Sequence, residues 1–306
     1  MMRGEEAHLP MGTLPALPQG ACDSHIHIND PDRFAYVPQA SLRPPPATVA
    51  DLARVWAGLG LERWVIVQPS SYGTDNRCTR EAAARLGGRA RAVVVIDVQT
   101  SDAEVARLHA LGARGVRFNL LRLSPVAAVA MREIAARIAP HGWHLQLHAA
   151  ADDIPALAGT LGRLPVPVVF DHLGRLPARD AAAHPAFGAI AGLLDAGRAW
   201  VKLSGVELVD DADAPAWRHA ADIARRLLAL APQRMVWGSN WPHPAHVVHG
   251  RETPVPADLL RWLDRVVGND AAAWQAVLAD NPAVLYGFGA PPLASSSTPF
   301  PSTTNA

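Results

Sequence analysis

The sequence predicts a single-domain α/β fold, a (β/α)₈ barrel of the TIM type. Eight short apolar segments with strand character alternate with helical segments, and polar residues gather where the apolar segments end. A doubly wound open sheet is disfavoured, because no Gly-x-Gly-x-x-Gly follows the first strand. At 306 residues the chain can hold one barrel of about 250 residues with additional segments at both ends.

The strands and helices are expected in strict alternation. The predicted strands begin near Ala21 and continue over 64–68, 92–98, 115–119, 143–148, 166–172, 200–204 and 235–237. The predicted helices cover 49–59 (with Thr48 as its cap and Gly60 as its stop), 77–86, 102–111, 127–139, 154–161, 182–194, 214–230, 256–267 and 271–279. Residues 29–46 form a connection with five prolines, and connections of this length are usually lids or substrate loops.

Both ends of the chain differ in composition from the barrel. Residues 1–19 mix proline, glycine and charge without periodicity and are expected to form an N-terminal arm. The Ser/Thr/Pro-rich residues 290–306 cannot build a core and are predicted to be a disordered tail. The barrel domain is therefore expected over 20–289.

Composition argues against several classes of function. Apolar residues make up 49% of the chain, yet the apolar runs are too short and too interrupted to cross a bilayer. The 28 basic and 28 acidic residues balance, without a basic block interleaved with aromatics, so neither nucleic acid nor membrane is an expected partner. Two cysteines and no leader-like segment predict the cytoplasm, a reducing compartment. The oligomeric state is left open.

Imidazole groups recur at the predicted strand ends. His25 and His27 lie on one side of the first strand, His148 ends the fifth, His172 ends the sixth, and Asn240 follows the eighth. One such histidine is usually a structural group, but strand C-termini meet at one rim of a barrel, so these side chains are expected to converge. Neutral imidazoles also bind Zn²⁺, which makes His25, His27 and His148 candidate ligands of one divalent metal. A site that binds no metal is the open alternative.

Other polar residues near these strand ends are candidates for substrate binding. A guanidinium group matches a carboxylate bidentately, although an arginine can also cap the barrel rim. His243 could act as a base, orient Asn240 or cap its loop. The substrate-binding candidates are Arg117, Arg122, Arg175, Lys202, Ser71, Tyr72 and Trp241.

Several segments resemble a known family. Residues 23–27, 170–175 and 237–243 are similar to the markers of the amidohydrolase superfamily in its amidohydrolase-2 branch. Residues 68–76 and 114–119 resemble 2-pyrone-4,6-dicarboxylate lactonase and related sugar-lactone enzymes. The resemblance spans about residues 20 to 288. It implies hydrolysis, or in some members isomerisation, of lactones that carry carboxylates, with or without a metal.

The chain departs from the lactonase pattern at two places. In that pattern the eighth strand ends on an aspartate that acts as base or metal ligand, whereas this chain has Asn240, whose amide cannot take up a proton. His148 stands where the lactonase has a tyrosine, and Leu123 lies near its second substrate-binding arginine, with Arg122 next to it. Lactone isomerisation and a catalytically silent lactone-binding barrel are therefore the alternatives.

The expected function is hydrolysis of a small carboxylated lactone at its ester bond. Water or a Zn²⁺-bound hydroxide would attack the carbonyl, and His25, His27 and His172 would stabilise the oxyanion. Arg117 and Arg175 would hold the carboxylate of this small anionic substrate.

Overall fold

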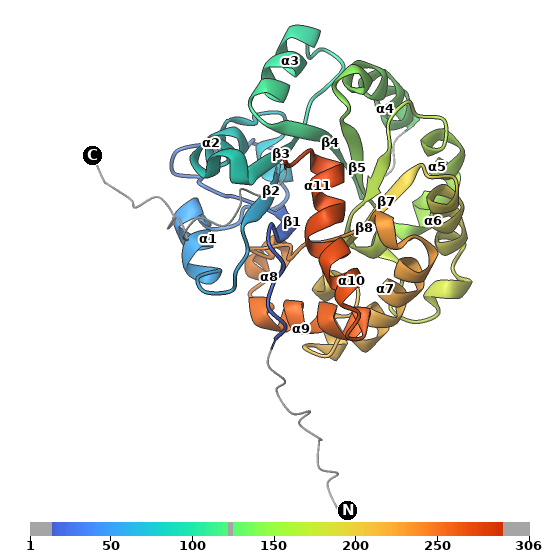
Figure 1. Cartoon of the computed structure of the whole chain (residues 1–306). Coiled ribbons are helices and arrows are strands. Elements are labelled where there is room, and N and C mark those ends of the chain that lie inside the picture. The colour runs from blue at the N-terminus through green and yellow to red at the C-terminus, as the bar shows by residue number, and fades with distance from the viewer. Residues whose placement is uncertain (1–13, 122–124, 290–306) are drawn as a thin grey trace, which may run out of the picture.

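Eight parallel strands form one sheet in sequence order, as the computed structural model shows (Figure 1). The structure describes residues 14–121 and 125–289, so most of the predicted arm, Arg122 and the predicted tail 290–306 lie outside the described residues. The strands are β1 (Cys22–Ile26), β2 (Arg63–Val67), β3 (Ala90–Val94), β4 (Ala113–Leu120), β5 (His144–Ala149), β6 (Val168–Phe170), β7 (Ala199–Leu203) and β8 (Met235–Trp237).

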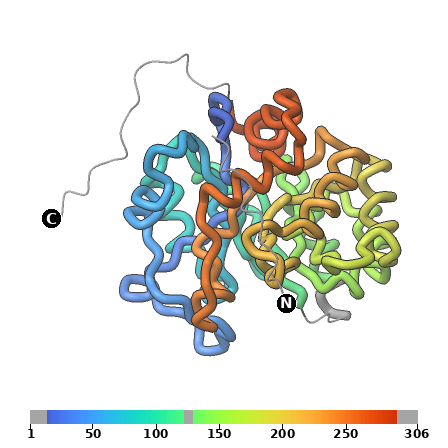
Figure 2. Tube along the Cα trace, turned by 90° about the horizontal axis from the view of Figure 1, so that it is seen from below, coloured from blue at the N-terminus to red at the C-terminus, as the bar shows by residue number. Residues whose placement is uncertain are grey.

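Helices surround the strands and alternate with them, which confirms the predicted (β/α)₈ barrel (Figures 1 and 2). They are α1 (Val49–Val55), α2 (Arg77–Leu86), α3 (Asp102–Ala110), α4 (Pro125–Ile138), α5 (Ile154–Leu161), α6 (Pro185–Asp195), α7 (Arg218–Leu230), α8 (Pro244–Val248), α9 (Pro256–Val267), α10 (Ala271–Gln275) and α11 (Asn281–Tyr286). None of the helices in the described part of the chain is both long and apolar enough to span a membrane.

Local sequence signals explain where α1 begins and ends. Thr48 caps the helix, and its side chain and that of Asp51 bond each other's backbone N–H groups in a capping box. The helix was expected to continue to residue 59 but ends at Val55, because Gly58 adopts a positive φ of 78° in the turn that follows.

The barrel closes between its first and last strands at their C-terminal ends. The N–H of His27 donates to the carbonyl of Trp241 over 2.8 Å, and the N–H of Asn240 donates to the carbonyl of His25 over 2.9 Å. Ile26 and Trp241 form an isolated parallel bridge. The two motifs that the sequence singled out, 23–27 and 237–244, are thus joined through their backbones.

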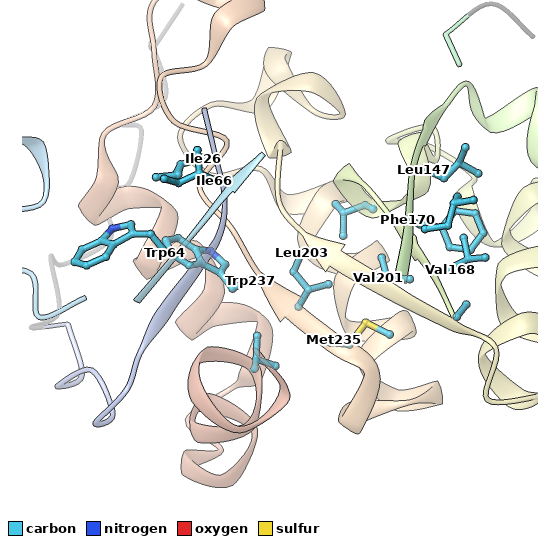
Figure 3. Packing of buried hydrophobic residues seen from close by; sticks show 14 of the residues in the cluster. Ile26, Trp64, Ile66, Leu147, Val168, Phe170, Val201, Leu203, Met235 and Trp237 are labelled. Atoms are coloured by element: carbon cyan, nitrogen blue, oxygen red, sulfur yellow. The ribbon is translucent and has the colours of Figure 1, made fainter. Parts of the chain in front are cut away.

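The apolar core has two layers. The larger layer lies between strands and helices, and Figure 3 shows part of it, including Trp64 of β2 and Trp237 of β8. The smaller layer consists of side chains such as Val65 and Val169, together with Tyr286 of α11. In Figure 1 α11 crosses the middle of the ring of strands, so it plugs the end opposite the strand C-termini.

Candidate active site

A cavity opens at the C-terminal ends of the strands, as the fold predicts. Its volume is about 170 Å³, below the ~300–1,000 Å³ typical of pockets for drug-sized molecules, so it fits a small ligand. The predicted loop 29–46 contributes Leu42 and Pro44 to it, and the segment after β8 contributes Pro244 and Ala245. The lining residues are His27, Asn29, Leu42, Pro44, Pro69, Ser70, Ser71, Arg117, Asn119, Leu121, His148, His172, Arg175, Leu208, Asn240, Pro244 and Ala245.

A β-bulge in β1 turns the His25–His27 pair into the barrel. Asp23 pairs with Trp64 and Ile26 pairs with Ile66, so three steps along β1 match two along β2. In a regular strand, side chains four positions apart, such as those of Cys22 and Ile26, face the same side. Here they face opposite sides: Cys22 belongs to the smaller core layer and Ile26 to the larger one. The bulge gives both histidines access to the interior.

The His25–His27 pair belongs to a chain of hydrogen bonds that begins at Lys202. The Lys202 ammonium has three protons and three acceptors, the Ser24 carbonyl at 2.8 Å, Gln146 Oε1 at 2.7 Å and His25 Nδ1 at 3.3 Å. His25 Nε2 then carries a proton and donates to Nε2 of His27 over 3.2 Å, while His27 Nδ1 donates to the Val67 carbonyl at 2.8 Å. The network is complete with neutral imidazoles.

Burial keeps both imidazoles neutral. It lowers the pKa of His25 to about 4, against the attraction of Asp171. Burial, assisted by His25, also holds the pKa of His27 well below its usual range. Burial lowers the pKa of Lys202 to about 8, although Asp171 partly counteracts this effect.

The His25–His27 pair also has the spacing of two metal ligands. A tetrahedral Zn²⁺ with Zn–N bonds of about 2.0–2.1 Å separates its ligand nitrogens by about 3.3 Å, close to the observed 3.2 Å between the Nε2 atoms. Binding needs a free lone pair on Nε2 of His25, and this requires its proton to move to Nδ1, which lies 3.3 Å from Oδ1 of Asp171. These two ligands fit a divalent ion in the other tautomer of His25. Asp171 and His172 are the nearby groups that could extend the ligand set.

His148, the third predicted metal ligand, has one of its two ring nitrogens in contact with an arginine. Nη2 of Arg117 lies 3.3 Å from Nδ1 of His148, and a guanidinium can only donate. Nδ1 therefore accepts, and the proton of this neutral imidazole lies on Nε2, which has no hydrogen-bond partner among the described residues. Burial lowers the pKa of His148 to about 3, and Arg117 adds to this effect. His148 thus offers an N–H donor to the cavity.

Asp171 is a buried carboxylate in contact with His25. Its Oδ2 accepts from Nε of Arg117 at 3.3 Å and from Nε2 of Gln146 at 3.1 Å. Burial alone would raise the pKa of Asp171, but the positive charges of Lys202 and Arg117 outweigh it and hold the pKa well below its usual range. Sequence reasoning passed over Asp171 as a site residue, although it lies in the 170–175 motif that carried the resemblance.

His172 contacts the cavity from the end of β6. It adopts a positive φ of 53°, and its Nδ1 lies 3.0 Å from the Ser204 hydroxyl. A Cβ at position 205 would lie 2.3 Å from Nδ1 of His172, so only glycine leaves room for the ring. Burial holds the pKa of His172 well below its usual range.

Arg175 is a cation at the cavity without a hydrogen-bond or ion-pair partner among the described residues. It lines the cavity, and no residue in the described part of the chain is recorded in a hydrogen bond or ion pair with its guanidinium. Burial lowers the pKa of Arg175, and the only opposing influence is the charge of Glu207. Arg117, by contrast, already contacts Asp171, His148 and the Gln68 carbonyl.

Asn240 lines the cavity with its amide orientation fixed by a neighbour. Its Nδ2 donates to Oε1 of Glu207 over 2.7 Å, so Oδ1 is left for a ligand. The same Oε1 accepts from Nδ1 of His243 at 2.9 Å. His243 itself does not line the cavity.

The remaining predicted residues divide between the cavity and its surroundings. Ser71 lines the cavity, but its hydroxyl donates to the Leu42 carbonyl at 2.8 Å. Tyr72 is buried, and its hydroxyl accepts from the N–H of Asp30. Tyr72, Trp241, His25 and Lys202 do not line the cavity.

Asn29 and Glu207 are buried polar residues that sequence reasoning missed. Neither polar atom of the Asn29 amide has a hydrogen-bond partner among the described residues, although the side chain lines the cavity. An amide that both donates and accepts suits a hydroxyl or carboxyl group of a ligand. A signal for Asn29 was present in the sequence. It follows His27 by two residues, and side chains two residues apart on an extended chain face the same side.

Known proteins resemble the chain over almost all of the barrel. The family model described as "Amidohydrolase" matches residues 22–288. A 2-pyrone-4,6-dicarboxylate hydrolase of Comamonas testosteroni is 33% identical over 281 residues, which cover 88% of this chain and 91% of the relative. A D-galactarolactone isomerase of Agrobacterium fabrum is 32% identical over 285 residues, covering 89% and 92%.

A solved structure shares the same architecture. It is of a probable 2-pyrone-4,6-dicarboxylic acid hydrolase of Acinetobacter baumannii with citric acid bound, and it is 25% identical with a TM-score of 0.73. The match covers 88% of this chain and 100% of the other. With the family model spanning the whole barrel and a relative 33% identical along its length, the chain belongs to the amidohydrolase family.

Proposed function

We propose that the protein hydrolyses the ester bond of a small carboxylated lactone in the cavity at the strand C-termini. The observation that carries the proposal is the Arg175 guanidinium, which faces this cavity and has no recorded partner among the described residues. A half-buried, uncompensated cation favours an anionic ligand, and a carboxylate matches its fork bidentately. Relatives named as lactone hydrolases and a relative bound to citric acid support the same class of ligand.

The lactone carbonyl has a matching donor. His148 lines the cavity, its Nε2–H has no partner among the described residues, and the contact of Arg117 with Nδ1 fixes the proton on Nε2. A preorganised donor of this kind stabilises the negative charge that develops on the carbonyl oxygen during attack. Arg117 has unused N–H groups that can assist Arg175 with the carboxylate.

Water would be placed by Asn240. With Nδ2 committed to Glu207, Oδ1 of Asn240 accepts a hydrogen bond from the nucleophile and orients its lone pair. One proton of the attacking water would pass to the leaving alkoxide of the lactone, and the new carboxylic acid would lose the other to solvent. A divalent ion held by His25 and His27 would supply a Lewis acid and lower the pKa of a bound water toward ~7. The roles of the chain's own residues stated above hold with or without that ion.

Isomerisation is the second candidate, and Asn240 is the observation that favours it. An amide takes up no proton. Isomerisation releases none, because the proton of the attacking lactone hydroxyl passes to the leaving alkoxide, whereas hydrolysis to a carboxylate releases one net proton. The D-galactarolactone isomerase relative is 32% identical to the chain.

Labelled water separates the two reactions. We expect turnover of a carboxylated lactone in H₂¹⁸O to place one ¹⁸O atom in the new carboxylate of the product, as mass spectrometry would show. Rearranged lactone without label would establish isomerisation. Binding without any turnover, by Asn240→Asp as well as by the natural chain, would contradict both reactions and identify a silent barrel.

A further inference from the structure

Glu207 is a buried carboxylate next to the cavity for which the proposed reaction has so far no use. It lies in the short 3₁₀ turn η7 (Val206–Leu208) after β7 and is 2% exposed. Its Oε1 accepts from Nδ2 of Asn240 at 2.7 Å and from Nδ1 of His243 at 2.9 Å. Its Oε2 has no hydrogen-bond partner in the described part of the chain.

The carboxylate is ionised despite its burial. Burial would raise the pKa of Glu207, but the proximity of His243 and the hydrogen bonds from His243 and Asn240 lower it below its usual value. An ionised carboxylate accepts hydrogen bonds and cannot donate one. Both side chains must therefore present N–H groups to it, and this fixes the amide of Asn240 and the proton of His243 on Nδ1.

The consequence for Asn240 is chemical as well as geometric. Residue 240 adopts a positive φ of 66°, in the left-handed region of backbone conformation where asparagine is enriched. A negative charge at the nitrogen end of an amide polarises it and makes the carbonyl oxygen a stronger acceptor. In the opposite orientation the N–H₂ group would face the cavity.

We propose that Glu207 is a positioning residue for the reaction: it holds Asn240 with Oδ1 toward the cavity, where this oxygen orients the attacking hydroxyl. The inference rests on the proposed function, because it needs a nucleophile with an O–H group at Asn240. Glu207 acts through Asn240 and does not touch the substrate. The inference applies equally to water and to a substrate hydroxyl.

The first test is to remove the charge. Glu207→Gln and Glu207→Ala, assayed with a carboxylated lactone, should lower kcat by at least about tenfold with KM changed less than about threefold, since the carboxylate of the substrate is bound elsewhere. Asp213→Asn is the matched control, because this acidic residue pairs with Arg218 away from the cavity. Unchanged kcat in both Glu207 variants, with the fold intact by circular dichroism, would overturn the inference.

The second test uses the pH profile, which a purely structural role would not move. Asn240→Asp places a second carboxylate against Glu207, and two carboxylates that share a site raise the pKa of one of them strongly. The acidic limb of kcat/KM should therefore lie at least about one pH unit higher in Asn240→Asp than in the double variant Asn240→Asp/Glu207→Gln. Coincident limbs would contradict the inference.

A readout without turnover keeps this inference separate from the proposed function. In ¹⁵N-labelled protein the side-chain amide signal of Asn240 is assigned by its loss in Asn240→Asp. Glu207→Ala should shift both of its proton resonances, and Asp213→Asn should not. If the natural chain turns over no lactone, the proposed function fails. The NMR measurement still tests whether Glu207 holds the side-chain amide of Asn240.

Discussion

Arg117 donates to Nδ1 of His148 across 3.3 Å, and this contact decides which nitrogen of the ring carries the proton. The guanidinium has no acceptor atom, so the neutral imidazole must carry its proton on Nε2, which is left free to donate to a ligand. The sequence suggested His148 as a metal ligand, yet a protonated nitrogen cannot ligate. The neighbour on β4, and not the histidine alone, thus determines the role that we assign to it.

Replacing His148 tests its role as a donor. His148→Phe should lower kcat/KM for a carboxylated lactone by about 10²–10³, the range for loss of one oxyanion donor. His148→Gln keeps an N–H group and should retain more activity than the phenylalanine variant. Steady-state kinetics would check this, with urea unfolding as the control for stability. Equal losses in the two variants would argue against a donor.

Arg175 and Arg117 should differ when each becomes methionine. Arg175→Met removes a cation without a recorded partner, so KM should rise by about 10–100-fold, since a hydrogen bond to a charged group contributes about 1.5–3 kcal/mol. The free energy of unfolding should change little. Arg117→Met should also destabilise the fold, because Asp171 loses a neighbouring buried charge. A neutral lactone is the control substrate, and an equal KM effect on it would contradict carboxylate binding by Arg175.

Acid should destabilise the protein through its buried imidazoles. Histidines ionise near pH 6.5 in an unfolded chain, whereas burial lowers the pKa of folded His25 to about 4 and those of His144 and His148 to about 3. The unfolded state binds more protons between these values, so stability is fully present above pH ~6.5. It falls below that by about 1.4 kcal/mol per pH unit for each imidazole.

Asp23 opposes part of this loss. Burial raises the pKa of Asp23 to about 6, so the folded state takes up its proton first and gains stability as the pH falls from about 6 to about 4. His144→Leu should remove the slope of one imidazole without affecting kcat, because His144 packs against Tyr286 and does not line the cavity. Urea titrations at pH 7, 6 and 5 would check both effects, and a stability independent of pH would contradict them.

Much of the fold was readable from the sequence because each strand of a barrel alternates inward and outward residues. On β4 and β5 this rule, together with the register Arg117↔Gln146 and Asn119↔His148, places the predicted side chains inside. The β1 bulge was not readable, since one extra residue in a strand leaves no mark in the pattern of apolar residues. Only the paired neighbours reveal it.

Glu207 was missed for a related reason. Its neighbours Val206 and Leu208 are apolar, and no spacing rule links it to Asn240, 33 residues later. The contact forms because the loops after β7 and β8 meet at the same rim, and loop conformations do not follow from composition. Lys202 is the opposite case. Its place at the end of β7 suggested substrate binding, yet its ammonium already donates to three acceptors inside the barrel.

Replacing Asn29 by an apolar residue should weaken substrate binding without destabilising the fold. An amide with two unpaired buried groups costs about 1–3 kcal/mol per group, so Asn29→Leu, of similar shape, should leave the free energy of unfolding unchanged or raise it. The same variant should raise KM, because the ligand loses a partner for its polar group. Urea unfolding and steady-state kinetics would measure the two effects. Loss of stability above about 1 kcal/mol would instead assign Asn29 a structural role.

Zn²⁺ affinity should depend on Lys202, since the ion and the ammonium compete for His25. Lys202 donates to Nδ1 of His25 and so favours the tautomer whose Nε2 is protonated, while metal binding requires the other tautomer. Lys202→Met removes both this donor and a positive charge, so Zn²⁺ should bind at least about tenfold more tightly, as competition with a chromophoric chelator would show. His27→Gln should abolish the site. His148→Gln should leave Zn²⁺ affinity unchanged, because Arg117 already keeps the lone pair of Nδ1 occupied; weakened binding in that variant would return His148 to the ligand set.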